Sequence, residues 1–359
     1  MGKNGRDRCT ARASSVVLLA CALVLLAYSD AAGEAGYAAM KLCASVIVPS
    51  LFPYMVISSL LVLSGAATEI GGWFARPVRY LFHLPGCAGS AFLLGALCGF
   101  PVGAKTACEL HENGSLTRQE CERLIAIANN TGPSFVIEVV GAHLWGSRGM
   151  GLTIYLSQIA SAVLIGWVDA RRSSIGMDHG QRESVSAPGP QDRMQCLSLA
   201  ISSSARAVLS VCGFIVFFGV ASTLAEMLLA RLHLGAAAPY ISALLEFSGG
   251  AARAADLGGV RGAFLTGFAV GWSGISIFAQ CKSFTAPHGI GLRHTALCKG
   301  IQGILVGASA AVYEAFFFVP SAVSSTVVPL QDIPASVWAA EILILAAMAL
   351  FFRQKSAIS

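Results

Sequence analysis

A short run of helix-breaking residues at positions 99–105 is closed by a lysine. Gly99, Pro101 and Gly103 interrupt an apolar stretch, and Lys105 ends it. Proline lacks an N–H group and clashes with the preceding helical turn, while glycine permits the dihedral angles of unwound backbone. In a membrane such backbone is tolerated only against other protein or a wet cavity. The run therefore predicts a broken membrane helix at a binding site, with Lys105 as an embedded ionisable residue that could contact the ligand.

The start of this run has a second copy in the other half of the chain. Residues 91–100 read AFLLGALCGF and residues 263–272 read AFLTGFAVGW, so five of the ten positions are identical. A membrane helix that is broken at the same place in both halves is the best sequence indication of a transporter's binding site. The alternative explanation is a kink for packing, with small residues for close helix contact. We expect Gly271 and Gly274 to shape the second break, and Ser273, Ser276 and Gln280 to bind the ligand.

Residues 129–133 read NNTGP and predict that one helix ends and another begins. The first of these helices starts at a capping-box pattern, Thr117 to Glu120. Asn130 or Thr131 could cap the second, and Pro133 suits its first turn. A helix N-terminus that points into the membrane offers N–H groups and partial positive charge to an anion. We therefore expect Asn129, Asn130, Thr131 and Gly132 to join the same ligand site, the alternative being an ordinary turn outside the membrane.

Glu246 stands in an apolar context, directly before Phe247 and Ser248. Ionisable groups embedded in a membrane are costly, and they are functional candidates by default. We expect Glu246 to orient hydrogen-bond donors at the site or to couple a proton.

The composition indicates that these residues are carried by membrane helices. Of the 359 residues, 55% are hydrophobic and only 12% are charged, and the mean hydropathy is +0.69. A soluble domain carries about 25% charged residues. A membrane span needs about 20 mostly apolar residues. We predict an all-α, polytopic membrane protein with about eight spans, near residues 14–29, 40–64, 86–108, 150–168, 200–230, 259–281, 295–318 and 335–352.

The spans form two related halves on either side of a polar linker. Basic residues precede the first span, occupy the linker and follow the last span, so the positive-inside rule places the linker and both termini in the cytoplasm. Each half has an odd number of core spans, which makes the repeats inverted and puts a site near the bilayer midplane. Basic segments follow both broken helices, and in their shared register Arg123 aligns with Lys299 and Arg118 with His294.

The predicted organisation has five parts. The first is a transmembrane anchor, for which a cleaved signal peptide is the alternative. The parts are residues 1–35 (anchor or signal-like segment), 36–168 (first repeat), 169–198 (cytoplasmic linker), 199–330 (second repeat) and 331–359 (last transmembrane helix and tail).

The chain lacks the motifs of enzymes, metal sites and nucleic-acid-binding proteins. It has no HExxH, no Walker-type phosphate loop and no GxSxG sequence. Its 11 cysteines are scattered and include no CxxC pair. The net charge of +5 is explained by the topology. We therefore expect no enzymatic activity, no metal, no cofactor and no nucleic acid partner.

Six motifs together resemble the sporulation integral membrane protein family. They are SLFPYMVISSLL from Ser50, GFPVGAK from Gly99, SLTRQECERL from Ser115, NNTGPSFVIEVVG from Asn129, LEFSGG from Leu245 and GWSGISIFAQ from Gly271. The resemblance implies two nucleoside-recognition (Gate) repeats and a fold similar to concentrative nucleoside transporters. It also implies that the chain moves dipicolinic acid from the mother cell across the outer forespore membrane. LEFSGG departs from the family pattern, because Ser248 and Gly249 stand where a polar Thr-Asn pair is expected.

The leading hypothesis is therefore a transporter of a small organic anion, with dipicolinate implied by the resemblance. A planar dianion suits helix N-termini, amide and hydroxyl donors and Lys105. The alternatives are a transporter of nucleosides or other carboxylates, or a non-transporting membrane scaffold for spore assembly. The expected partners are the small anionic substrate, the lipid bilayer, and further copies of the chain or other sporulation membrane proteins. The expected location is the mother-cell or outer forespore membrane.

Overall fold

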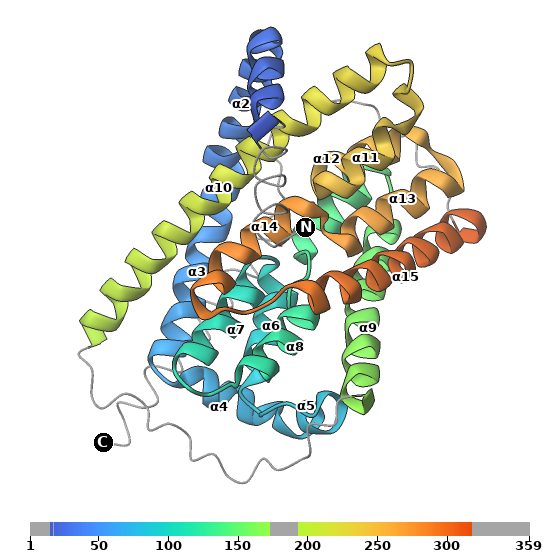
Figure 1. Cartoon of the computed structure of the whole chain (residues 1–359). Helices are drawn as coiled ribbons and strands as arrows, with labels where there is room; N and C mark the ends of the chain where they lie inside the picture. Colours follow the sequence, from blue (N-terminus) through green and yellow to red (C-terminus); the bar gives the residue numbers. More distant parts are fainter. Residues whose placement is uncertain (1–14, 17, 173–192, 318–359) are drawn as a thin grey trace, which may run out of the picture. The chain divides into compact units, whose positions relative to one another are not determined.

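The structure, a computed structural model, describes residues 15–16, 18–172 and 193–317 (Figure 1). In this part of the chain all regular secondary structure is helical, as the composition predicts. Most of the predicted linker, the predicted span at 335–352 and the basic residues near both ends lie outside the described residues.

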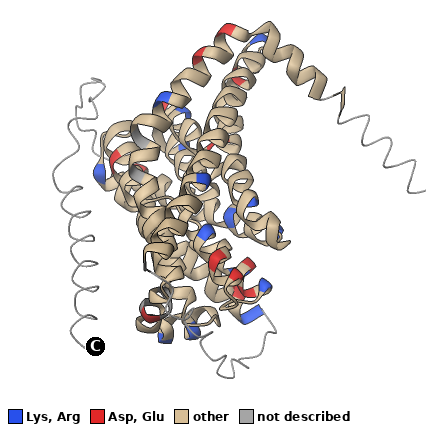
Figure 2. Cartoon of the chain, turned by 90° about the vertical axis from the view of Figure 1, so that its left-hand side faces the viewer, with Lys and Arg blue, Asp and Glu red and all other residues tan. Residues whose placement is uncertain are grey.

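Among the described residues, four helices are long and apolar enough to cross a membrane, and a fifth candidate is bent. The fifth joins Leu18–Ala27 to Ser29–Ser45 at an angle of 93°. Figure 2 shows that charged residues are sparse along most of the ribbon, which fits an integral membrane protein. The four helices, which match predicted spans, are α9 (Arg148–Arg172), α10 (Arg193–Arg231), the α13–α14 segment (Gly259–His288) and α15 (Arg293–Phe317).

Two further predicted spans within the described residues form shorter helices. Residues 40–64 lie in a continuous helical run that contains a π-helical turn, and residues 86–108 are divided in two by an interruption. The expectation of eight spans in inverted repeats therefore stays a prediction, whereas the all-helical membrane fold is supported. The helices from the first of these spans to the end of the second, with the two short helices between them, are α2 (Ser29–Leu42), η1 (Cys43–Ile47), α3 (Val48–Leu63), α4 (Ala66–Trp73), α5 (Ala75–Phe82), α6 (Ala88–Cys98) and α7 (Val102–Glu112).

Helix α8 (Arg118–Ala128) begins at the capping box that the sequence predicts. The Thr117 hydroxyl accepts a hydrogen bond from the Glu120 amide (3.2 Å), and the Glu120 carboxylate accepts one from the Thr117 amide (2.7 Å). These bonds satisfy amide groups that the first helical turn leaves unpaired. The chain is interrupted after α8 and continues in the π-helical η2 (Phe135–Leu144), which leads to α9.

The second half follows a similar order after α10. Helices α11 and α12 pack against each other, and α12 packs against α13. The interruption between α13 and α14 then precedes a turn and α15. The bounds are η3 (Gly235–Ala237), α11 (Ala238–Leu245), α12 (Phe247–Leu257), α13 (Gly259–Trp272), α14 (Gly274–Thr285) and η4 (Ala286–His288).

Helices α13 and α15 pack closely along their lengths, and glycines line their contact. A Cβ atom built on Gly267 would lie 2.9 Å from the Cα atom of Gly307. Small residues allow helix backbones to approach each other in a membrane protein. Buried apolar side chains, including Val136, Ile154 and Val306, continue this core onto η2 and α9. The packing fixes the end of α13, where the second break lies.

Candidate functional site

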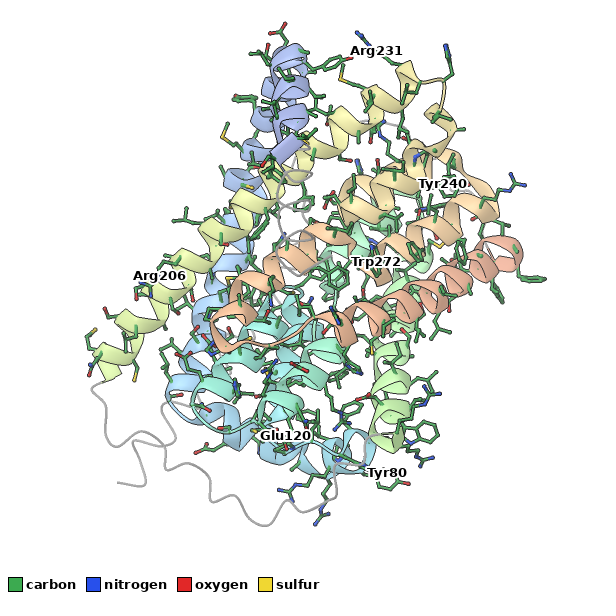
Figure 3. The ribbon with its side chains drawn as sticks, viewed as in Figure 1. Tyr80, Glu120, Arg206, Arg231, Tyr240 and Trp272 are labelled. Carbon is green, nitrogen blue, oxygen red and sulfur yellow. The ribbon has the colours of Figure 1, made fainter. Side chains whose placement is uncertain are left out.

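Both copies of the glycine motif end in an interrupted helix, as predicted. In the first copy α6 ends before Gly99, and in the second α13 ends before Ser273. The φ angles of Gly99, Ser273 and Gly274 are 80°, 74° and 80°, in the left-handed region that side chains disfavour. Figure 3 shows Trp272 at the place where α13 meets α14.

Two of the predicted break-forming glycines lie inside helices instead. Gly103 belongs to the first turn of α7, and Gly271 to the last turn of α13. A Cβ atom on Gly103 would lie 2.2 Å from the carbonyl oxygen of Ala128, and one on Gly271 would lie 2.8 Å from the Cα atom of Gly303. These positions therefore need glycine for close backbone contact, which corrects the expectation that they shape the breaks.

The break after α6 lies directly against the interruption after α8. A Cβ atom on Gly99 would lie only 2.7 Å from the backbone nitrogen of Gly132. Pro101 and the residues from Asn129 to Thr131 are all buried around this contact. The structure thus brings together the two first-half motifs that the sequence singled out.

The break between α13 and α14 lies against another interruption, between α11 and α12. A Cβ atom on Gly274 would lie 3.0 Å from the Cα atom of Glu246. The adjacent Phe247 ring contacts the Phe100 ring, with centroids 4.8 Å apart. The Thr131 hydroxyl donates to the Val270 carbonyl over 3.4 Å. These contacts join four interruptions into one region of buried and partly buried residues, called the junction below: Gly99–Pro101, Asn129–Gly132, Glu246–Phe247 and Ser273–Gly274.

A network of buried amide groups and one lysine adjoins the junction. The Lys299 ammonium donates to the Oδ1 atom of Asn130 (3.2 Å) and to the Oε1 atom of Gln302 (2.7 Å). Gln302 also donates to the same Asn130 oxygen (3.0 Å) and to the backbone carbonyl of Gln158 (2.8 Å). These side chains are at most 1% exposed. The network ties α8, α9 and α15 together at the interruption after α8.

Thr131 is held by Gln158 and does not cap a helix. The Thr131 amide donates to the Gln158 side-chain oxygen (3.3 Å), and the Gln158 amide donates to the Thr131 carbonyl (3.0 Å). No side chain caps η2. The expected capping by Asn130 or Thr131 is therefore wrong, because tertiary contacts engage both side chains. The Asn130 side-chain oxygen accepts from Lys299 and Gln302 of α15, and the Thr131 hydroxyl donates to the Val270 carbonyl of α13.

Three predicted residues lie on or against α14. Ser276 and Gln280 are buried in this helix, being 1% and 2% exposed. The side-chain amide of Asn129 donates to the Cys281 sulfur (3.2 Å). The Oδ1 atom of Asn129 and the Ser276 hydroxyl oxygen are buried without a hydrogen-bond partner. An acceptor and a hydroxyl thus remain available in the interior beside the junction.

Glu246 caps the N-terminus of α12. Its carboxylate accepts hydrogen bonds from the amides of Ser248 (3.0 Å) and Gly249 (2.7 Å), and from the Ser248 hydroxyl. The negative charge therefore offsets the positive end of the α12 dipole. Helix α14 has no side-chain cap, so its first amide groups are not satisfied in this way.

Lys105 lies one turn beyond the first break, where it is paired within the protein. Its ammonium contacts the Glu109 carboxylate and the Ser59 hydroxyl. The lysine is 5% exposed. Lys105 and Glu109 border a pocket of about 310 Å³ between α7, α10 and α14, which Arg206 and His288 also line. The structure therefore places Lys105 beside the junction but gives its charge an internal partner.

Sequence reasoning missed three members of the amide network: Gln158, Lys299 and Gln302. Gln158 and Gln302 are single polar residues within apolar helices, and they belong to no motif. Only one feature of the sequence pointed to Lys299, namely its alignment with Arg123 in the two basic segments. The structure gives these two residues different partners, since Arg123 donates to the Asp169 carboxylate (2.6 Å).

A second pocket, of about 660 Å³, opens where α14 is followed by α15. Lys282, Arg293 and His294 line it, together with the acidic Glu122. The Glu122 carboxylate is engaged by the Gly291 amide (2.9 Å) and by Arg118 (3.3 Å). His294 is paired with the Asp169 carboxylate (2.9 Å), so within this lining Lys282 and Arg293 carry the positive charge that no described carboxylate pairs with.

Comparison with known proteins gives one informative match. The chain is similar to the sporulation integral membrane protein YlbJ of Bacillus subtilis strain 168, with 23% identity over 313 residues. The match covers 78% of this chain and 77% of the relative. No family model and no solved structure matches the chain. The match supports a place among sporulation integral membrane proteins, while the Gate repeats and the dipicolinate type stay predictions.

Proposed function

We propose that this chain is a membrane transporter that carries a small organic anion, dipicolinate, across the outer forespore membrane during sporulation. The junction is the observation that carries the proposal. It collects four backbone interruptions in the interior of a protein made of apolar helices. Unwound backbone inside a membrane protein is costly, and transporters use it to bind substrates.

The chemistry of the junction favours an anion over a neutral solute. The start of α14 and the break before α7 present backbone amides that no side chain caps. Helix N-termini and hydroxyl or amide donors bind carboxylates well. The similarity to a sporulation membrane protein supports the biological setting. The two termini and the linker then face the mother-cell cytoplasm.

Flux through the purified protein in liposomes tests the proposal. We expect dipicolinate uptake that saturates with concentration, that requires the protein, and that excess nucleoside leaves unchanged. Empty liposomes are the control. Uptake that is absent or unsaturable contradicts the proposal, and competition by a nucleoside assigns the flux to the alternative transporter class.

The phenotype of a strain that lacks this protein, compared with that of an Asn130→Ala strain, distinguishes a transporter from a scaffold. Transport predicts spores poor in dipicolinate while the mother cell retains it. Asn130→Ala, which removes an amide at the junction, should reproduce this defect. A scaffold predicts normal dipicolinate loading in the Asn130→Ala strain and defects only when surface residues are changed.

A further inference from the structure

Lys299 is a buried cation without a carboxylate partner in the described part of the chain. It is 1% exposed, and it donates to two neutral amide oxygens, on Asn130 and Gln302. The ion pairs formed by the described residues do not include it. An ammonium held away from water without a counter-charge is strongly unfavourable, particularly in a membrane protein.

The other buried basic side chains are neutralised within the protein. Among the described residues these are Lys105 and Arg123, which pair with Glu109 and Asp169. Lys299 is therefore the one buried basic side chain in this part of the chain that has no carboxylate partner. The difference matters, because the sequence had pointed to Lys105 as the cation of the site.

The geometry around Lys299 already resembles a carboxylate-binding arrangement. The Oδ1 atom of Asn130 accepts from the Lys299 ammonium (3.2 Å) and from the Gln302 amide (3.0 Å). A carboxylate oxygen would receive the same two donors, and the charge would strengthen both bonds. The Asn130 amide group is anchored separately, since it donates to the Ile127 carbonyl (2.7 Å).

The pocket of about 660 Å³ lies at the start of α15, the helix that carries Lys299. Arg293 and Ala296 line this pocket, and they precede Lys299 by six and three residues in the same helix, which is about 1.7 and 0.8 turns. Ala296 and Lys299 are three residues apart and therefore share a helix face, whereas Arg293 lies on a different, exposed face of α15. An anion attracted by Lys282 and Arg293 would thus be held at the start of the helix that carries Lys299.

We propose that Lys299 supplies the counter-charge for the transported anion. A substrate carboxylate takes the place of the Asn130 amide oxygen, and it accepts from the Lys299 ammonium and the Gln302 amide. Gln158, which holds Thr131, is a positioning residue. The identity of the anion rests on the proposed function, whereas the site itself rests on the burial and the partners of Lys299.

Ligand-induced thermal stabilisation of the purified protein in detergent tests this site. The probes are dipicolinate and its neutral analogue pyridine-2,6-dicarboxamide. We expect dipicolinate to raise the unfolding temperature of the wild type, and the dicarboxamide to have little effect. Lys299→Met should weaken dipicolinate binding at least tenfold and remove the preference for the anion. Lys299→Arg, which keeps the charge, should retain that preference.

Two further variants keep the test decisive. Lys105→Met should retain the preference for the anion, because Glu109 already neutralises that lysine. Asn130→Asp provides an internal counter-charge for Lys299, so dipicolinate should no longer stabilise this variant. If Lys299→Met does not fold, the Asn130→Asp variant still tests whether Lys299 binds the anion. Full stabilisation of Asn130→Asp, or of a folded Lys299→Met, overturns the proposal, and so does loss of the preference in Lys105→Met alone.

The results also separate this inference from the proposed function. Lys299-dependent stabilisation by dipicolinate without flux in liposomes supports the site and contradicts the transport role. Saturable flux that Lys299→Met leaves unchanged supports the transport role and contradicts the Lys299 site. A wild-type protein that neither dipicolinate, succinate nor sulfate stabilises overturns the Lys299 site.

Discussion

Two glycines allow α6 and α7 to contact the last carbonyl group of α8. A Cβ atom on Gly95 would lie 1.8 Å from the Ala128 oxygen, and one on Gly103 would lie 2.2 Å from it. Both distances are far shorter than van der Waals contact. Since Ala128 directly precedes Asn129, these glycines determine how closely the first break approaches the interruption after α8.

We expect Gly95→Ala to destabilise the protein by about 3 kcal/mol, because overpacking against a backbone carbonyl must push helices apart. Gly213→Ala is the matched control. Gly213 lies in the helix α10, and a Cβ atom at this position would have no other atom within 4 Å, so alanine should be neutral or slightly stabilising. Thermal unfolding in detergent compares the two variants. Equal unfolding temperatures would show that α6 and α8 do not pack in this way.

The residues of the junction and of the adjoining amide network divide into those that local sequence predicts and those that it does not. Gly99 and Pro101 act through their own backbone restrictions, so their effect is visible without knowing the fold. Gln158 and Gln302 act through partners far apart in sequence. A single amide within an apolar helix has no periodicity or spacing that distinguishes it. Such residues become recognisable only when the helices are packed together.

At the scale of the elements, the start of α12 depends on Glu246. Its carboxylate satisfies two backbone amides and a hydroxyl at the helix N-terminus, directly beside Gly274. The sequence predicted a role for this residue from its apolar context alone. The structure adds a capping role, which anchors the α11–α12 interruption within the junction.

Glu246→Ala should lower the free energy of unfolding by about 1–2 kcal/mol, because the Ser248 and Gly249 amides lose their acceptor. Glu246→Gln should have a smaller effect, since an amide oxygen still accepts but the favourable charge at the helix terminus is lost. Thermal unfolding measures both effects. If Glu246 couples a proton instead, Glu246→Gln should keep full stability and abolish the pH dependence of dipicolinate flux.

The two halves of the chain are similar only in part. Both contain the break that follows the AFLxG motif, as the sequence predicts. The interruption after α8 has no counterpart in α15, which is continuous from Arg293 to Phe317. In the shared register, residues 305–308 read LVGA where residues 129–132 read NNTG. Without the polar pair and the following proline, helix α15 continues, so the amide network is built on one broken and one intact helix.

At the scale of the whole molecule, α10 decides whether the halves can be inverted. Its apolar segment, Met194–Arg231, contains 38 residues. At about 1.5 Å per residue it is much longer than a bilayer core of about 30 Å. Figure 3 shows Arg206 and Arg231 well separated along this helix. The basic end of α9, with Arg171 and Arg172, precedes α10 and favours a cytoplasmic start.

Labelling of single cysteines at the two ends of α10 tests this topology. Met194 and Leu232 are exposed, at 68% and 58%, and each can be replaced by cysteine. The background carries Cys9→Ser and Cys21→Ser, because Cys21 is exposed and Cys9 lies outside the described residues. We expect a membrane-impermeant maleimide to label Met194→Cys only in inverted vesicles and Leu232→Cys only in intact cells. If both react from the same side, α10 does not cross the bilayer. The second half would then begin on the wrong side to be an inverted copy of the first.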